Sequence, residues 1–401
     1  MNDTPPAETT WQGRYDNALM VVKKLVPPSL FPALFLLPFV YGIFRLLHRH
    51  IQQFLDTETI ICAGNNVLTH TPIYAPTNCF GMVPTSFVYP PITAWLESAI
   101  QPRIGATGVI MMFGFIYFTV FAAVLRAALR RDTLLYWRAP FLLSFSASGL
   151  MEGNVSIIFH GTLFFLALAT LDTPLLLWPA IVLAAVLKPP IAIYAVLFMF
   201  HDQKFIRRII LAGSAILAIL VITGATYFID PQNFSQWLHQ LQIVHTVFVQ
   251  GHSIMATLEF FGIRNALAEF IIYLPFALAI LGAGLLVAHY GRLPPAERIM
   301  LGITICLLLY PRLLDYDQFT LPFGLAVLAE CFSLVSWPGK IWFRRILLGG
   351  CATFAIAGGV RGGLILFWFS VLLLFTLAIQ LAFQDRKNLT SFARGVLRPV
   401  S

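Results

Sequence analysis

Long apolar runs alternate with short polar segments along most of the chain, and this pattern predicts a bundle of membrane-spanning helices. An α-helix needs about 20 apolar residues to cross a bilayer. Several runs are shorter, so paired half-helices or kinked spans are expected, and the count is about twelve within roughly 10–13. The runs lie near residues 27–47, 104–126, 139–152, 155–171, 174–188, 189–201, 209–228, 268–289, 299–311, 319–337, 346–359 and 363–384. The predicted fold class is an all-α polytopic bundle, one integral membrane domain over residues 1–401.

The composition leaves little room for a soluble domain. Of the 401 residues, 58% are hydrophobic and 11% are charged, whereas a soluble domain carries about a quarter charged residues. No Walker loop or GxGxxG motif occurs, so a soluble nucleotide-binding domain is not expected. The first residues are polar rather than apolar, and we expect no cleavable signal peptide.

The basic residues alternate between the connections in a way that predicts the topology. Most of the 26 Lys and Arg residues fall in every second connection, and the positive-inside rule assigns that set, with both termini, to the cytoplasm. The net charge of +8 therefore reports topology, and we expect no nucleic-acid partner. The two longest polar loops, 48–103 and 229–266, then face outward. Together with the absence of targeting signals, this predicts a multi-pass protein of a bacterial inner membrane with its site on the periplasmic face.

Acidic residues follow directly after the first apolar run. Asp56 and Glu58 open the first outer loop, in "FLDTETI". The segment "ETIICAGNNVLTH" is typical of a short amphipathic helix lying on the membrane. "YPPITAWLESAI" begins a second one, since Pro suits the first turn of a helix. Cys62 and Cys79 share this loop, and a disulfide between them or two free thiols both remain open.

The order of these elements resembles the GT-C superfamily of membrane glycosyltransferases, in which an acid after the first span precedes two juxtamembrane helices and a "PP…W" element. Three later segments, "MEGNVSIIFHGTLFFLALA", "AAVLKPPIAIYAVLFMF" and "LLLYPRLLDYDQFTLPFGLAVL", resemble the family-87 glycosyltransferases, which use polyprenol-phosphate-mannose. The resemblance covers about residues 54–330. It departs where Glu152-Gly153-Asn154 replaces a common Gly-Gln, and where Tyr310 replaces a common Ser. The sugar, a hexose such as mannose or a pentose, and the acceptor therefore stay open.

The resemblance implies an inverting transfer from a polyprenyl-phosphate-linked sugar to a hydroxyl of a lipid or glycan acceptor. A carboxylate must accept the hydroxyl proton, and Asp56 is the expected general base. Cations would stabilise the leaving phosphate, and Lys188 and Arg312, each beside a Pro, are expected in that role. The resemblance implies no metal, and we expect no other cofactor.

Further candidates for substrate binding share the predicted outer face, and each has a plain structural alternative. Glu58 can be a first-turn acid of its helix, Tyr89 an interface anchor, and the Glu152–Asn154 turn a satisfied helix break. Aspartates near Arg312 can simply tie a turn. The candidates are Glu58, Tyr89, Glu152, Asn154, Lys188, His252, Arg312, Asp315 and Asp317. His160, on an apolar face, is expected to be a packed core histidine.

Two other classes of function compete with a transferase. A transporter or flippase of lipid-linked sugars would fit about twelve spans, but such proteins usually show two similar halves, and no internal repeat is visible. A non-catalytic membrane assembly subunit would leave the acids of the outer face unexplained. Sugar transfer by the purified protein separates these alternatives.

Overall fold

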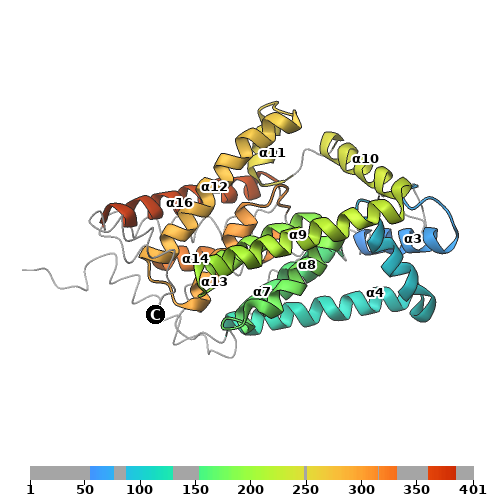
Figure 1. The fold of residues 1–401 in the computed structure, drawn as a ribbon, viewed down its shortest axis with the longest axis horizontal. Coiled ribbons are helices and arrows are strands. Elements are labelled where there is room, and N and C mark those ends of the chain that lie inside the picture. Colours follow the sequence, from blue (N-terminus) through green and yellow to red (C-terminus); the bar gives the residue numbers. More distant parts are fainter. Residues whose placement is uncertain are drawn as a thin grey trace, which may run out of the picture.

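The computed structural model describes residues 55–75, 87–129, 153–247, 251–314, 316–331 and 360–384. Every regular element in these ranges is helical, and none is a strand, which confirms the all-α prediction (Figure 1). Within the described residues, the helices long and apolar enough to cross a membrane lie in α4 (Pro91–Leu129), α9 (Phe205–Ile229), α12 (Ala266–Tyr290) and α16 (Val360–Gln384). Shorter apolar helices lie between α4 and α9. The runs 27–47, 139–152 and 346–359 are outside the described residues, so about twelve spans stays a prediction.

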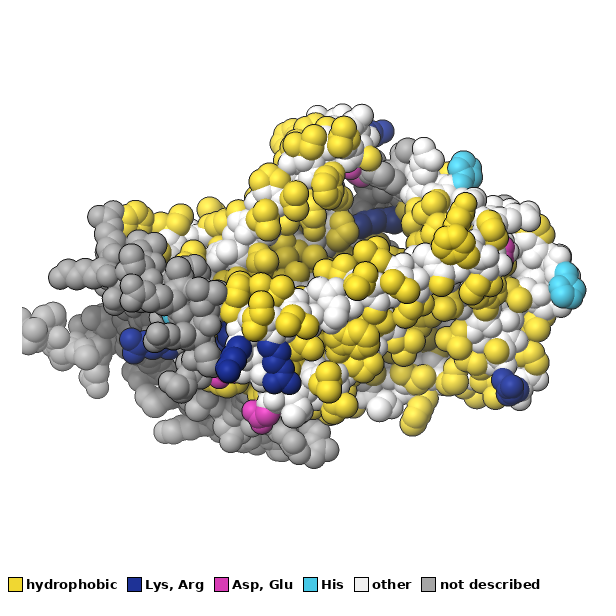
Figure 2. All heavy atoms as spheres, viewed as in Figure 1, with side chains coloured by type: hydrophobic (Ala, Val, Ile, Leu, Met, Phe, Trp, Pro, Cys, Tyr) yellow, Lys and Arg dark blue, Asp and Glu magenta, His cyan; other side chains and the backbone are white. Residues whose placement is uncertain are grey.

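The long helices present apolar side chains to their surroundings. On α9, Leu217, Leu220 and Val221 are each more than 60% exposed, and Ile271 and Leu278 on α12 are 60% exposed. Figure 2 shows hydrophobic side chains along the exposed face of both helices. A contiguous apolar surface of this extent is rare on soluble monomers. It is the surface that lipid covers in a membrane protein.

The first outer loop forms two packed helices, as predicted, but with different limits. Helix α3 (Leu55–Leu68) begins three residues before the predicted segment, with Asp56 and Glu58 both in its first turn. The second juxtamembrane helix is the first part of α4, beginning at Pro91, and the predicted span is the second part. A kink at Gly105 (φ 71°) joins the two parts, and glycine adopts this left-handed conformation without a Cβ clash. Cys62 on α3 forms a disulfide, and Cys79 lies outside the described residues.

The interior is built from short apolar segments around one fully packed helix. These are α7 (Val155–Ala169), η2 (Pro174–Leu176), α8 (Leu177–Leu187), η3 (Pro189–Phe200) and α13 (Pro295–Leu308). From Ile299 to Leu308 every residue of α13 is buried. The smaller elements around this core are α10 (Pro231–Val247), α11 (Ile254–Phe260), η4 (Asp317–Thr320) and α14 (Leu321–Cys331).

Close packing between α13 and η3 depends on Gly302. A Cβ at this position would come within 2.8 Å of both Leu197 and Phe200. We expect Gly302→Leu to lower the stability of the protein by at least about 2 kcal/mol, because an overpacked core cannot relax without moving backbone. Thermal unfolding in detergent, followed by size-exclusion chromatography, measures this. Gly213→Leu on α9, where a Cβ meets nothing within 4 Å, is the matched control and should behave as wild type.

Several elements of the core begin or end at the same end of the bundle. Helix α7 begins at Val155, α8 ends at Leu187, η3 begins at Pro189 and α13 ends at Leu308. Segment η3 is a 3-10 helix of 12 residues, and at about 2.0 Å rise per residue it extends roughly 24 Å. The chain therefore leaves the Lys188 end of the bundle and reaches the opposite end at His201, where exposed Lys204 and Arg207 open α9.

Candidate functional site

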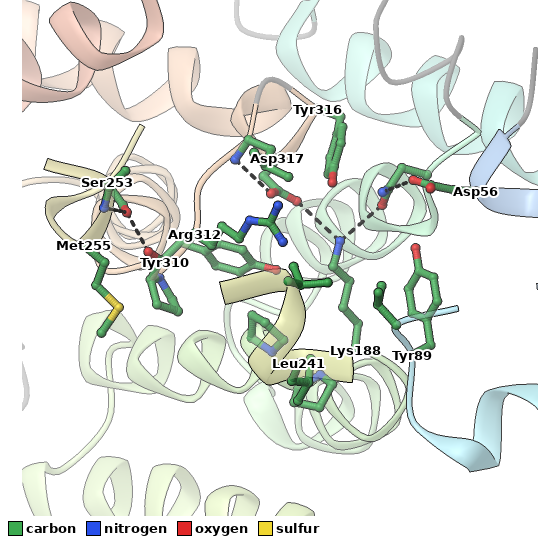
Figure 3. Close-up of a pocket in the computed structure, with 18 of the residues that line it drawn as sticks. Asp56, Tyr89, Lys188, Leu241, Ser253, Met255, Tyr310, Arg312, Tyr316 and Asp317 are labelled. Carbon is green, nitrogen blue, oxygen red and sulfur yellow. Dashed lines mark hydrogen bonds and ion pairs between the residues drawn. The ribbon is translucent and has the colours of Figure 1, made fainter. Parts of the chain in front are cut away.

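A cavity of about 400 Å³ lies where these helix ends meet α3, α10 and α11 (Figure 3). Its walls combine an acidic and basic cluster with an apolar side. The residues that line it are Asp56, Val88, Tyr89, Pro90, Asn154, Lys188, Pro189, Pro190, Trp237, Leu241, Val244, Ser253, Met255, Ala256, Glu259, Tyr310, Pro311, Arg312, Leu314, Tyr316 and Asp317. Segments more than 250 residues apart in the sequence thus share one cavity, which only the tertiary fold could assemble.

Asp56 is held at the edge of this cavity by the start of α7. The Asn154 side-chain amide donates a hydrogen bond to the Asp56 carboxylate, while the neighbouring Thr57 hydroxyl donates to the Gly153 carbonyl at 2.7 Å. Asn154 also caps α7, since its side-chain oxygen accepts from the Ser156 amide at 2.9 Å. The Asn154 side-chain oxygen therefore caps the start of α7, and its side-chain NH₂ group holds the Asp56 carboxylate.

Lys188 occupies the break between α8 and η3. Its amide donates to the Ala184 carbonyl at 2.8 Å and ends α8, and the two prolines that follow prevent the α-helix from continuing. Its ammonium donates to the Asn154 side-chain oxygen at 3.2 Å and to the Ser156 hydroxyl. It also lies 5.3 Å from the centre of the Tyr316 ring. Figure 3 shows the ammonium between Asp56 and Asp317, in the middle of the cavity.

Asp317 lies behind Lys188 in a fully buried network. One carboxylate oxygen is 3.7 Å from the Lys188 ammonium and 3.2 Å from His160 Nε2, and the other accepts from the Leu314 amide at 3.1 Å. His160 Nδ1 is 2.7 Å from the Tyr194 hydroxyl. The His160 and Tyr194 side chains are both fully buried. His160 is therefore a packed core residue, and it also positions the carboxylate that holds Lys188.

The two carboxylates are in opposite electrostatic environments. Burial raises the pKa of Asp56, and the attraction of Lys188 and the bond from Asn154 offset this only in part. Burial also opposes ionisation of Asp317, but Lys188, His160 and the Leu314 amide outweigh it and lower its pKa. Two carboxyl groups whose pKa values are pushed apart can take different roles. Asp56 is suited to accept a proton, whereas Asp317 is suited to remain a fixed anion.

Of the candidates from the sequence, the structure gathers six around the cavity and separates two from it. Asp56, Tyr89, Asn154, Lys188, Arg312 and Asp317 all line it. Glu58 and His252 do not line it. Glu152 and Asp315 lie outside the described residues.

His252 instead supports the turn that carries Arg312. Its amide donates to the Leu313 carbonyl at 2.6 Å, and the adjacent Ser253 hydroxyl donates to the Pro311 carbonyl at 2.5 Å. The His252 side chain is 2% exposed and packs so closely on α16 that a Cβ at Gly363 would collide with its ring. Its position fits a structural role in joining α11, the Arg312 turn and α16.

The cavity also contains groups that sequence reasoning missed or placed loosely. Tyr310 and Tyr316 line the cavity together with Lys188 and Arg312. Glu259 lines it from α11. Trp237 of α10 also lines the cavity and donates from Nε1 to the Val88 carbonyl at 3.2 Å. The sequence signal that could have identified Tyr310 is its place directly before Pro311, where a helix is predicted to break. A residue at such a break lies at the end of a core helix, and the cavity lies where the core helices end.

Known proteins offer no guide to this site. No family model matches the chain, and no curated protein or solved structure is significantly similar to it. Among the described residues, no group of three or more His, Cys, Asp or Glu side chains could hold a metal ion. The chemistry of the cavity therefore has to be inferred from its own residues.

Proposed function

We propose that the protein is a membrane glycosyltransferase that moves a sugar from a polyprenyl-monophosphate donor to an acceptor hydroxyl. The observation that carries this proposal is one cavity that joins a carboxylate of raised pKa to two cations. Asp56, Lys188 and Arg312 line the same 400 Å³ space. A base beside a cationic site is what transfer between a hydroxyl and a phosphate leaving group requires.

In the proposed reaction, the acceptor oxygen attacks the anomeric carbon from the side opposite the phosphate. The hydroxyl proton passes to Asp56 as the new carbon–oxygen bond forms. The bond between the anomeric carbon and the phosphate oxygen breaks, and its electron pair stays on that oxygen. Lys188 and Arg312 stabilise the resulting polyprenyl phosphate. Asp56 then releases its proton to water, which restores the enzyme.

The apolar side of the cavity supports a lipid-linked donor. Leu241 and Val244 on α10 and Met255 on α11 form a wall beside the charged cluster. Leu241 is 39% exposed, so this wall extends to the surface of the protein. A polyprenyl chain could lie along it while the phosphate reaches Lys188. A water-soluble sugar nucleotide would gain nothing from such a wall.

The proposal is tested with the full chain in nanodiscs. We would supply radiolabelled polyprenyl-phosphate sugars, hexoses and pentoses in turn, together with a membrane lipid extract as the source of acceptor. Transfer of label to an extract component supports the proposal and identifies the sugar. If no donor supports transfer and labelled lipid instead crosses the bilayer of proteoliposomes, the protein is a flippase and the proposal fails.

We expect transfer to be insensitive to chelation. The leaving phosphate faces two protein cations, Lys188 and Arg312, which can balance its charge without a divalent ion. The rate in EDTA should therefore equal the rate in added Mg²⁺ or Mn²⁺, within about twofold. A loss of activity in EDTA that Mn²⁺ restores would contradict this expectation and assign part of the charge stabilisation to a metal.

A further inference from the structure

We propose that the Tyr310 hydroxyl binds a phosphate oxygen of the lipid-linked ligand, as a third group beside Lys188 and Arg312. This inference deepens the proposed function and rests on it. Tyr310 was not a candidate from the sequence.

The Tyr310 side chain is fixed but its hydroxyl is unused. The residue is 1% exposed, and its ring packs edge-on against His160 with centroids 5.5 Å apart. Its amide donates to the Leu307 carbonyl at 3.0 Å, which continues the turn at the end of α13. In the part of the chain that the structure describes, no group forms a hydrogen bond with the buried hydroxyl.

A buried hydroxyl without a partner is costly. Leaving such a group unpaired destabilises a protein, and phenylalanine would fill the same space without this cost. The other buried tyrosine beside His160 has no such deficit, because the Tyr194 hydroxyl is 2.7 Å from His160 Nδ1. The Tyr310 hydroxyl therefore has its hydrogen-bonding capacity available for a molecule that enters the cavity.

The surroundings of this hydroxyl select the chemistry of that molecule. Tyr310 lines the cavity, and in Figure 3 its ring lies beside Arg312 with the hydroxyl turned toward the Lys188 side. A neutral O–H donor that shares a cavity with two cations favours an anionic acceptor with several oxygens. A phosphate monoester can accept from all three groups at once. Sugar hydroxyls fit the opposite side better, where Asp56 accepts and Tyr89 provides a ring.

The test measures binding rather than transfer. Wild type, Tyr310→Phe and Tyr117→Phe would be titrated in nanodiscs with farnesyl phosphate, and with farnesol as the probe that lacks phosphate, by isothermal titration calorimetry against empty nanodiscs. Tyr117 is a buried tyrosine of α4 that does not line the cavity. We expect Tyr310→Phe to weaken farnesyl phosphate binding about tenfold. Farnesol binding and the Tyr117→Phe variant should be unchanged.

The outcomes separate this inference from the proposed function. Equal binding of farnesyl phosphate by wild type and Tyr310→Phe overturns the role of Tyr310 and leaves the transferase proposal intact. Equal loss for farnesol and farnesyl phosphate also overturns it, because the hydroxyl then serves packing. If wild type binds farnesyl phosphate and farnesol equally well, the cavity does not recognise phosphate. Both the role of Tyr310 and the transferase proposal then fail. The thermal stability of Tyr310→Phe should equal or exceed that of wild type, so a folding defect cannot imitate the expected result.

Discussion

Asp56→Asn is expected to reduce sugar transfer at least about 100-fold, the lower end of what a positioned general base contributes. The substitution is nearly isosteric and removes only the capacity to accept a proton. The Asn side-chain oxygen can still accept the hydrogen bond that Asn154 donates to Asp56. Donor binding to Lys188 and Arg312 should persist, so the loss should appear in kcat with KM for the donor changed by less than about threefold.

The stability of this variant provides its control. Burial raises the pKa of Asp56, which means that the folded state disfavours the ionised carboxylate. The contribution of the protonated Asp56 carboxyl to folding stability is fully present below the pKa of Asp56 in the unfolded chain. This contribution is lost as the pH rises through the pKa of Asp56 in the folded protein. At neutral pH the neutral Asn avoids this cost, and Asp56→Asn should melt at the wild-type temperature or above. Glu58 lies in the same first turn of α3 but does not line the cavity. The Glu58→Gln variant should therefore transfer sugar as wild type does.

The pH dependence of the wild type follows from the same environment. A general base works only when ionised, so kcat should fall as the pH decreases toward the raised pKa of Asp56. The acidic limb should therefore lie above the pH range of an ordinary aspartate, and it should be absent from the residual activity of Asp56→Asn. A wild-type rate from a folded Asp56→Asn protein would show that another group takes the proton, and would remove Asp56 from the mechanism.

The sequence was sufficient for the helical class and for several residues that line the cavity, because their signals are local. Apolar runs of sufficient length predict α9, α12 and α16, and an acid after the first run predicts Asp56. The break at Lys188 was visible as a Lys followed by two prolines. These features depend on residues that are neighbours in the chain, so composition and spacing report them without knowledge of the packing.

Other parts of the site depend on contacts that no local pattern encodes. His160, on an apolar helix face, gave no sign that its ring would meet Asp317, which follows it by 157 residues. His252 was a candidate because it lies in the second predicted outer loop, yet its ring packs against α16. The helix that begins at Pro91 and the separate span after it were both predicted, but the position of the kink between them, Gly105, was not, since Pro90 and Pro91 predict the start of a helix but not where it ends.

Lys188→Met is the second substitution with a large expected effect, on both stability and transfer. It leaves the Asp317 carboxylate, which is 2% exposed, without the cation 3.7 Å away. Removing one partner of a buried ion pair costs about 3–5 kcal/mol, and the Lys188 side chain is itself 14% exposed, so we expect about 3 kcal/mol. Transfer should fall at least about 100-fold, because the leaving phosphate loses a cation.

The double variant Lys188→Met/Asp317→Asn distinguishes a broken ion pair from a general packing defect. If the cost of Lys188→Met is an unpaired buried charge, neutralising Asp317 should restore most of the lost stability, whereas transfer should remain as low as in Lys188→Met. Additive losses in this double-mutant cycle would show that the two side chains are not energetically coupled. Thermal unfolding and transfer rates on the same preparations provide both readouts.

The pH dependence of stability gives a sign test of the same ion pair. In wild type the pKa of Asp317 is lowered, so its stabilising effect is present above the unfolded pKa and is lost as the pH falls through the folded value. Without Lys188, burial dominates and the folded pKa should rise above the unfolded one. The Lys188→Met protein should then gain stability as the pH is lowered through that raised pKa, the reverse of the wild-type contribution. An unchanged sign would mean that His160 and the Leu314 amide alone keep Asp317 ionised, and that Lys188 is not what holds this buried charge in place.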